Sequence, residues 1–223
     1  YIDNLVDDKV LGSQIISELI ECQPEMPEEL PHLLSIPELK VTDQKRDIIY
    51  DMLGGNVVIH IDGHSRAGLA NIATMPTRSL AAPENESQVI GSQIGFNESL
   101  GTNISLVRQL IKNANLCNEE FTVGKQTNTS FSMLYIKKIV SEENVNTVRQ
   151  RVTSLEIEDL IDSAMLAELI EDNSYSIFPQ MLLTERPDRF CDGLLNGKIG
   201  IIVNGSSMAI LCPCSFLELF HSR

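Results

Sequence analysis

Two clusters of side chains in this sequence have residue types that could carry chemistry. His60, Asp62 and His64 stand at alternate positions, and alternate residues of a strand point to one face of a sheet. Imidazole and carboxylate groups on one face are the ligands of a zinc site, such as that of a hydrolase. Arg186 and Asp188 resemble a charged cluster at a helix start, where a carboxylate or phosphate can bind. Both clusters also have structural interpretations, which depend on the elements that carry them.

An internal repeat bears on the first cluster. Residues 40–69 align without a gap over residues 182–211, with eight identical positions. In this alignment the three residues of the first cluster fall opposite Ile202, Asn204 and Ser206, none of which is a zinc ligand. The repeat therefore favours a hairpin whose turn happens to carry two imidazoles, and it predicts two copies of one folding unit.

The second copy predicts strands that alternate with helices. The expected elements are a strand over residues 131–136, a helix through Val145, Val148, Val152 and Leu155, a helix over residues 158–170, a strand over residues 181–184, and a helix from Pro187 to near Gly197. A hairpin over residues 198–211 follows, and its Asn204-Gly205 pair is typical of a type I′ turn. We therefore expect an α/β protein of two related small subdomains, each a mixed sheet packed by helices.

The expected domain organisation follows from the repeat and from a change in composition. Residues 1–75 form the N-terminal subdomain, residues 76–94 a linker with two prolines and few large apolar residues, and residues 95–223 the C-terminal subdomain. The C-terminal subdomain opens with a helix that we expect Asn97 to cap. Because the first copy has no counterpart of that opening upstream of Tyr1, we expect it to be truncated at its start.

Composition excludes several classes of function. A formal net charge of -14 would repel a phosphate backbone, so no nucleic-acid partner is expected, and Lys137 with Lys138 are too few to form a basic patch. Five cysteines without a C-x-x-C pair indicate reduced thiols in a cytosolic compartment. No apolar run approaches the roughly 18 residues of a membrane span, so the isolated chain is expected to be soluble.

Five stretches of the sequence carry a resemblance to a known family. They are GFNESLGTNISLVRQLIK (95–112), EEFTVGKQT (119–127), LYIKKIV (134–140), LIEDNSYSIFPQMLLTERPD (169–188) and LLNGKIGIIVNGSSMAILCPCSFLELFHS (194–222). Together they resemble the N-terminal soluble region of the A subunit of spore germinant receptors, the GerA family of endospore-forming bacteria. The resemblance is dense over residues 83–222, while residues 1–75 are similar to the more variable first half of that region.

The resemblance implies a receptor domain that is not an enzyme and that holds no cofactor or metal. It implies a position on the cytoplasmic face of the spore inner membrane, B and C receptor subunits as partners, an amino acid or sugar germinant as the signal, and membrane-spanning segments after residue 223. Four residues that match the family pattern are the candidates for a ligand site or an interface: Asn103, Arg108, Arg186 and Asp188.

Three functions stay open at the level of the sequence. The leading hypothesis is a domain that senses or relays a germinant signal, in which a ligand bound between the two subdomains would change the angle between them. The second is a scaffold that docks other subunits; an exposed apolar helix face would favour it, whereas a polar-lined cleft would favour ligand binding. The third is a hydrolase with zinc on His60 and His64.

Overall fold

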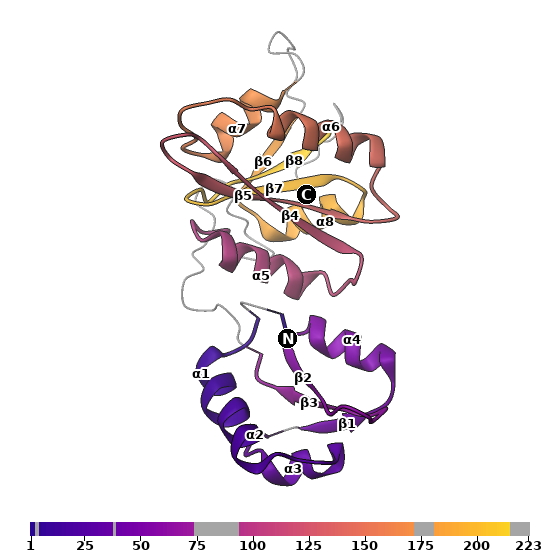
Figure 1. The fold of residues 1–223 in the computed structure, drawn as a ribbon. Coiled ribbons are helices and arrows are strands. Elements are labelled where there is room, and N and C mark those ends of the chain that lie inside the picture. Colours follow the sequence, from indigo (N-terminus) through magenta and orange to yellow (C-terminus); the bar gives the residue numbers. More distant parts are fainter. Residues whose placement is uncertain (3–4, 38, 74–93, 172–180, 215–223) are drawn as a thin grey trace. The chain divides into compact units, whose positions relative to one another are not determined.

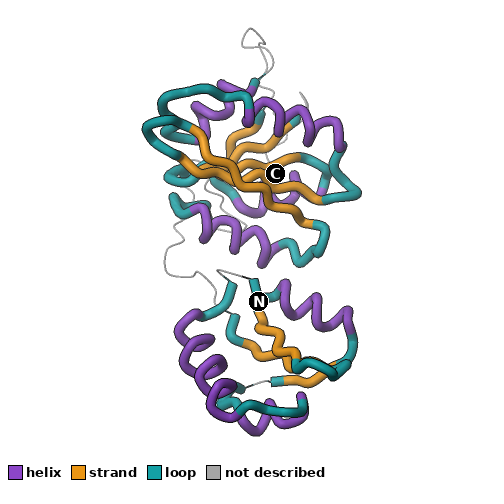
Figure 2. Tube along the Cα trace, in the orientation of Figure 1, coloured by secondary structure: helices purple, strands orange, loops and turns teal. Residues whose placement is uncertain are grey.

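The computed structural model describes residues 1–2, 5–37, 39–73, 94–171 and 181–214 (Figures 1 and 2). Contacts divide the chain into an N-terminal unit, Tyr1–Pro76 with Lys112–Ala114, and a C-terminal unit, Thr77–Ile111 with Asn115–Arg223. The expected linker over residues 76–94 lies, apart from Ile94, outside the described residues, so the domain boundaries stay a prediction. No helix within the described ranges is long and apolar enough to cross a membrane.

The N-terminal unit is built on a three-stranded antiparallel sheet with the strand order β1-β3-β2. The strands are β1 (Lys40–Thr42), β2 (Asn56–His60) and β3 (Ala67–Asn71). The helices are α1 (Asp8–Val10), the π-helical η1 (Leu11–Ile16), α2 (Ser17–Cys22), the 3₁₀ turn η2 (Pro27–Glu29), α3 (Leu30–Leu33) and α4 (Lys45–Leu53). Val57, Ile59 and Ala70 share one sheet face and form the core together with the apolar residues of the helices before β1.

A five-stranded sheet with the order β4-β5-β7-β8-β6 forms the centre of the C-terminal unit, and all its pairings are antiparallel. The strands are β4 (Leu116–Val123), β5 (Thr129–Ile136), β6 (Leu182–Thr184), β7 (Ile199–Val203) and β8 (Ala209–Cys212). The helices are α5 (Leu100–Leu110), α6 (Glu142–Thr153), α7 (Ser163–Ile170) and α8 (Pro187–Leu195). The predicted α/β class, two small sheets packed by helices, is thereby confirmed. The sheets were expected to be mixed, but all the pairings between their strands are antiparallel.

Successive side chains of a strand point to opposite faces of the sheet, so the C-terminal unit has one hydrophobic core on each face. On β5, Phe131 and Met133 face α6 and α7, whereas Leu134 and Ile136 face α5 and α8. Figure 1 shows the two pairs of helices on opposite sides of the sheet. Because both faces are covered, the central strand β7 is buried along its whole length, which explains its unbroken apolar sequence.

The two repeated copies fold alike, down to the register of their strands. The order β1-α4-β2-β3 of the first copy recurs as β6-α8-β7-β8 in the second. Thr42 pairs with Ala67 between β1 and β3, and the aligned Thr184 pairs with Ala209 between β6 and β8. Equal registers at aligned positions show that the eight identities reflect one folding unit that occurs twice.

The hairpin turns differ from the expected type I′ geometry. Gly63 and Gly205 have φ values of 83° and 86°, but Asp62 and Asn204 do not have positive φ. A type I′ turn needs positive φ at both central residues. The last paired residues are His60 and Ala67 in the first copy and Ile202 and Ala209 in the second, so both connections are longer than a two-residue turn.

The helix expected over residues 158–170 begins only at Ser163, with Asp162 as its N-cap. The residues before it bind the loop between β4 and β5 instead. Leu160 N–H donates to Thr127 Oγ1 at 3.1 Å, and Thr129 Oγ1 donates to the Leu160 carbonyl at 2.6 Å. These hydrogen bonds replace the helical ones, and Leu160 is buried with 1% of its surface exposed.

Candidate functional site

Arg186 and Asp188 form a bidentate ion pair at the start of α8. Arg186 Nε donates to Asp188 Oδ1 at 3.1 Å, and Nη2 donates to Oδ2 at 2.6 Å. The side chain of Arg186 is only 10% exposed, whereas that of Asp188 is 40% exposed. The hydrogen bond from Arg186 holds the pKa of Asp188 below its ordinary value. Because the two hydrogen bonds join the residue before α8 to the first turn of the helix, the pair stabilises this helix start.

Asn103 binds the segment that precedes α5. Its fully buried side chain donates to the carbonyl of Asn97 at 2.5 Å and accepts from the N–H of Asn97 at 3.0 Å. One residue earlier, Phe96 N–H donates to the carbonyl of Glu185 at 2.8 Å. The structure therefore brings Asn103 into the same neighbourhood as Arg186, at the point where the starts of α5 and α8 meet.

The N-cap of α5 differs from the expectation. Ser99 is the cap, and its Oγ accepts from Thr102 N–H at 3.4 Å. Asn97 instead accepts the N–H of Ser99 at 2.9 Å and so forms a turn just before the helix. A short polar side chain serves either role, which is why the sequence alone did not separate them.

Arg108 lies apart from this group, five residues beyond Asn103 in the last turn of α5. Partial burial lowers the pKa of its guanidinium from the ordinary value. A cation in the last turn complements the negative end of the helix dipole. Arg108 thus has a structural role in α5, and a ligand or interface role for the four candidates stays a prediction.

The possible zinc ligands do not converge in the described part of the chain. His60 Nε2 lies 2.9 Å from the carbonyl oxygen of His64; His60 is the exposed last residue of β2, and His64 is a half-buried residue of the loop that follows. Asp62 Oδ1 accepts the N–H of Gly63 at 3.0 Å. Among the described residues no group of three His, Cys, Asp or Glu side chains could hold a metal ion. The hairpin interpretation accounts for all three residues.

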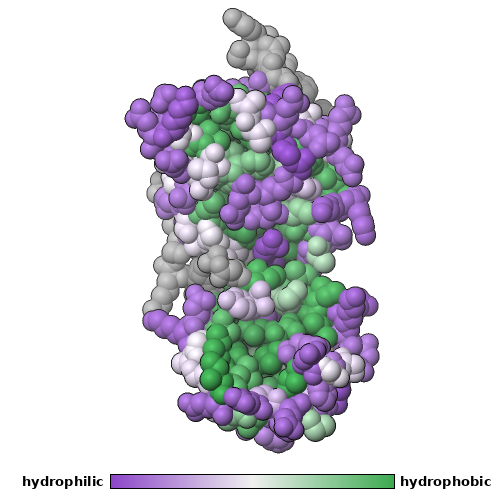
Figure 3. Space-filling view, in the orientation of Figure 1, coloured by the Kyte–Doolittle hydropathy of each residue, from purple (hydrophilic) through white to green (hydrophobic). Residues whose placement is uncertain are grey.

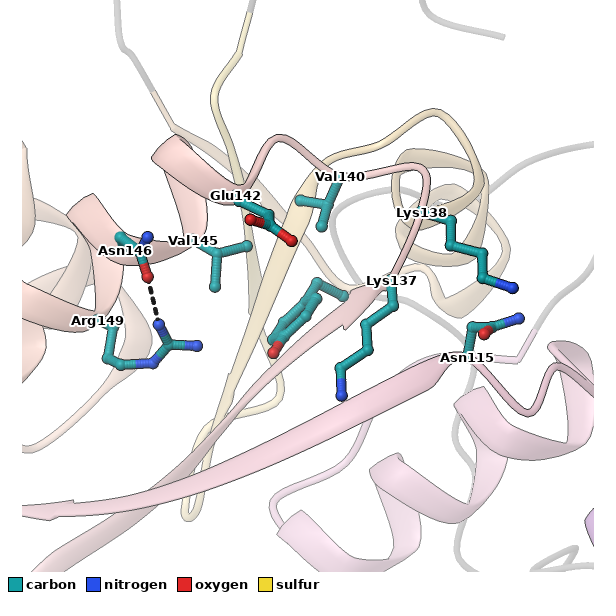
Figure 4. A pocket seen from close by; sticks show the side chains of 9 residues that line it. Asn115, Lys137, Lys138, Val140, Glu142, Val145, Asn146 and Arg149 are labelled. Atoms are coloured by element: carbon teal, nitrogen blue, oxygen red, sulfur yellow. Dashed lines mark hydrogen bonds between the residues drawn. The ribbon is translucent and has the colours of Figure 1, made fainter.

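A pocket of about 500 Å³ lies in the C-terminal unit, between the end of β5 and the first turns of α6 (Figure 4). Its lining is mainly polar or charged: Asn115, Tyr135, Lys137, Lys138, Val140, Glu142, Val145, Asn146 and Arg149. Figure 4 shows Lys137, Lys138 and Asn115 on one side, Asn146 and Arg149 on the other, and Glu142 between them. A volume of this size is typical of small-molecule sites.

A hydrogen-bonded triad fixes one wall of the pocket. Tyr135 Oη donates to Glu119 Oε1 at 2.6 Å, and Arg149 donates from Nη2 to Oε1 at 2.6 Å and from Nε to Oε2 at 2.8 Å. The bond from Arg149 lowers the pKa of Glu119, and the same bond raises the pKa of Arg149. Burial, followed by the bond to Glu119, raises the pKa of Tyr135 to about 12. The wall therefore keeps one protonation state across the physiological range.

The pocket was not predicted from the sequence. Lys137 and Lys138 alone are too few for a basic patch, and Arg149 joins them only when α6 folds back beside β5. One signal was available: Glu142, Asn146 and Arg149 stand at i, i+4 and i+7, so a helix places them on one face beside the lysine pair.

Comparison with known proteins identifies the family. The family described as Bacillus/Clostridium GerA spore germination protein matches residues 1–223. The chain belongs to the GerA family. Two similar proteins come from Bacillus subtilis (strain 168). Spore germination protein B1 is 36% identical over 233 residues, and spore germination protein KA is 32% identical over 227 residues. Each match covers 100% of this chain, but only 47% and 42% of the respective relative, so the chain spans about half of their length.

A solved structure of a GerA-type domain resembles the fold. It is the crystal structure of the N-terminal domain of the A subunit of the Bacillus megaterium spore germinant receptor GerK3. The two share 26% sequence identity with a TM-score of 0.62, over 94% of this chain and 73% of the other. The resemblance to spore germinant receptors is therefore confirmed at the level of sequence and of structure.

Proposed function

We propose that this chain is the N-terminal region of a germinant receptor A subunit and that it senses or relays the nutrient signal that starts germination. The likeness to the N-terminal domain of the GerK3 A subunit, over 94% of the chain, is the observation that carries this proposal. The polar-lined pocket of the C-terminal unit supports a sensing role, because the hydrogen bonds of Glu119 with Tyr135 and Arg149 pre-organise one of its walls.

The rest of the receptor is inferred from the family. We expect a complex with B and C subunits at the spore inner membrane, this region on the cytoplasmic face, and an amino acid or a sugar as the germinant. We also infer a non-enzymatic role. The two clusters with residue types found in catalytic sites make local contacts instead: Arg186 binds Asp188, and His60 lies within hydrogen-bonding distance of the carbonyl of His64.

Deletion of the full-length gene tests the proposal. Spores that lack it should lose the fall in optical density that follows addition of one class of nutrient, and a copy of the gene should restore it. The response to a non-nutrient trigger of germination serves as the control and should be retained. Unchanged responses to every nutrient tested would contradict a receptor role.

A scaffold function without ligand binding is the second candidate. Ile16 and Ile20 are 47% and 67% exposed, and four residues apart they lie on one face of the helical segment η1-α2. Figure 3 shows hydrophobic residues gathered on the drawn face of the N-terminal unit. An exposed apolar face of this kind is typical of surfaces that dock another subunit.

A further inference from the structure

Strand β2 lies at the edge of the N-terminal sheet, although its counterpart lies inside the C-terminal sheet. In the second copy β7, the equivalent of β2, pairs with β8 on one side and with β5 on the other. Among the described residues, β2 pairs with β3 alone. An open strand edge presents unpaired N–H and C=O groups, which favour the addition of another strand. The second copy therefore indicates what belongs at this edge.

The backbone groups at the open edge follow from the same comparison. Asn204 N–H donates to the Ser130 carbonyl at 2.9 Å, so the backbone of Asn204 faces β5. Alternate residues of a strand direct their backbone groups to the same side, and Ile202 therefore faces β5 as well. The residue aligned with Ile202 is His60. The N–H and C=O groups of His60, and by the same alternation those of Val58, thus lie at the open edge.

The likeness of the two copies extends upstream of the aligned residues 40–69 and 182–211. The first residues, YIDNLVDD, align with YIKKIVSE at residues 135–142, with three identical positions. Leu5 N–H donates to the Ile2 carbonyl at 3.3 Å, and the aligned Ile139 N–H donates to the Ile136 carbonyl at 3.2 Å. The same turn therefore precedes both copies.

The helix after this turn begins in the same way in both copies. Asp7 is the N-cap of α1, and the aligned Ser141 is the N-cap of α6. Counting back from these caps, Tyr1 corresponds to Tyr135, which is a residue of β5. The counterpart of β5 in the first copy is therefore the stretch that runs into Tyr1.

Apolar surface adjoins the open edge. Helix α4 packs against β2, and its apolar residues Ile48, Ile49 and Met52 are only half-buried. The equivalent residues of α8 are Phe190, Cys191 and Leu194. Those three are buried, because they form one hydrophobic core with residues of α5 and β5. The second copy thus covers with β5 and α5 a surface that the described part of the first copy leaves half-exposed.

We propose that the open edge of β2 is filled by a strand of the same polypeptide, formed by the residues that directly precede Tyr1 in the full-length protein. This strand runs antiparallel to β2, as β5 does to β7. Ser132 pairs with Ile202, so the third residue before Tyr1 lies opposite His60. The proposal concerns the fold of the N-terminal unit and does not depend on the proposed function.

Covalent continuity favours this source over a second copy of the chain or another subunit. Because Tyr1 corresponds to a residue of β5, the preceding residues already lie beside β2, and a foreign strand would need the same edge. The match to the GerK3 domain covers only 73% of that chain, so a domain of this kind contains residues beyond the matched ones.

Disulfide cross-linking in the full-length protein tests the proposal. One cysteine replaces the third residue before Tyr1, and the other is introduced as His60→Cys, in a Cys22→Ser background because Cys22 is exposed. Opposite residues of an antiparallel pair have Cα atoms about 4.5–5.5 Å apart, a distance that a disulfide spans. Mild oxidation should therefore link the two cysteines within one molecule, as measured by non-reducing peptide mapping with mass spectrometry.

The control variant carries Ile61→Cys in place of His60→Cys. A shift by one residue along a strand places the side chain on the opposite face, so this pair should stay unlinked. A missing link with His60→Cys, or an equal link with Ile61→Cys, would overturn the proposal. A disulfide-linked dimer of the His60→Cys single variant, or a link to another subunit, would also overturn it, because a foreign strand would then occupy the edge.

Residue-resolved hydrogen–deuterium exchange on the unaltered full-length protein needs no cysteines and decides the matter if the variants do not fold. The amides of Val58 and His60 should exchange as slowly as those of Val57 and Ile59, which face β3. Fast exchange at Val58 and His60 beside slow exchange at Val57 and Ile59 would show that the edge is open and would overturn the proposal.

Discussion

Gly55 and Gly197 occupy equivalent corners of the two repeated copies, and each faces a backbone carbonyl. Their φ values are 95° and 83°. A Cβ added at Gly55 would lie 2.7 Å from the carbonyl oxygen of Leu5, and one added at Gly197 would lie 3.0 Å from that of Ile139. In each copy, the segment that precedes the aligned residues therefore packs against the equivalent glycine. The structural repeat thus extends beyond the aligned residues.

Substitution of these glycines gives the first prediction. Gly55→Ala combines left-handed strain, about 1–2 kcal/mol, with overpacking of about 1–3 kcal/mol against the Leu5 carbonyl. Gly63 has a similar φ of 83° but open space around it, so Gly63→Ala should show the strain alone. Urea unfolding followed by circular dichroism measures both, and equal losses of stability would contradict the close contact.

Removal of the Asn103 side chain should destabilise the C-terminal unit. Asn103→Ala leaves the buried N–H and carbonyl of Asn97 without their partner, at a cost of about 1–3 kcal/mol. Gln150→Ala, at an exposed position of α6, should stay within about 0.5 kcal/mol of the unaltered chain. Urea midpoints that coincide for the two variants would show that Asn103 does not hold the segment before α5.

The phenol of Tyr135 should report on the triad of the pocket. Its pKa of about 12 reflects burial first, the hydrogen bond to Glu119 second and the charge of Glu119 third. In Glu119→Gln the charge is lost and burial remains, so the pKa should fall but stay above the ordinary value of about 10. Titration of the ¹³Cζ tyrosine signals measures it, with Tyr135→Phe to assign the resonance; an unchanged pKa would show that Glu119 does not contribute.

Acid should abolish the contribution of the Arg186–Asp188 pair. Because the pKa of Asp188 is lowered in the folded state, its stabilising effect is present above the unfolded value of about 4 and is lost as the pH falls through the folded value. At pH 7, Asp188→Asn should cost no more than about 1 kcal/mol, because the carboxylate is 40% exposed. The cost should shrink below pH 4 and be smaller in an Arg186→Gln background, where only the backbone hydrogen bonds of Asp188 and Arg189 still lower the pKa of the carboxyl; a constant difference across pH would refute the pairing.

The backbone of Lys138 should cost the fold some stability. Lys138→Gly relieves left-handed strain of about 1–2 kcal/mol, against which the extra flexibility of glycine costs about 0.5–1 kcal/mol. The variant should therefore be at least as stable as the unaltered chain in thermal unfolding. A lower melting temperature would show that the lysine side chain itself stabilises the turn.

The repeated unit could be predicted from the sequence, because the eight identities between residues 40–69 and 182–211 can be recognised without knowledge of the fold. It could not predict that Leu160 would be bound by Thr127 and Thr129, since these partners are about thirty residues away. The same limit applies to the candidate site. Arg186 and Asp188 are neighbours in sequence and were singled out, whereas Glu119, Tyr135 and Arg149 meet only across β4, β5 and α6.

Hydrogen–deuterium exchange on the assembled, full-length receptor tests the central claim most directly. If this region senses or relays the signal, addition of the nutrient that triggers germination should change amide protection within residues 1–223, including the turn at Lys137 and Lys138. A nutrient that does not trigger germination is the control and should change nothing. Unaltered protection throughout residues 1–223, in a receptor that still responds to the nutrient, would contradict the claim and leave the scaffold role.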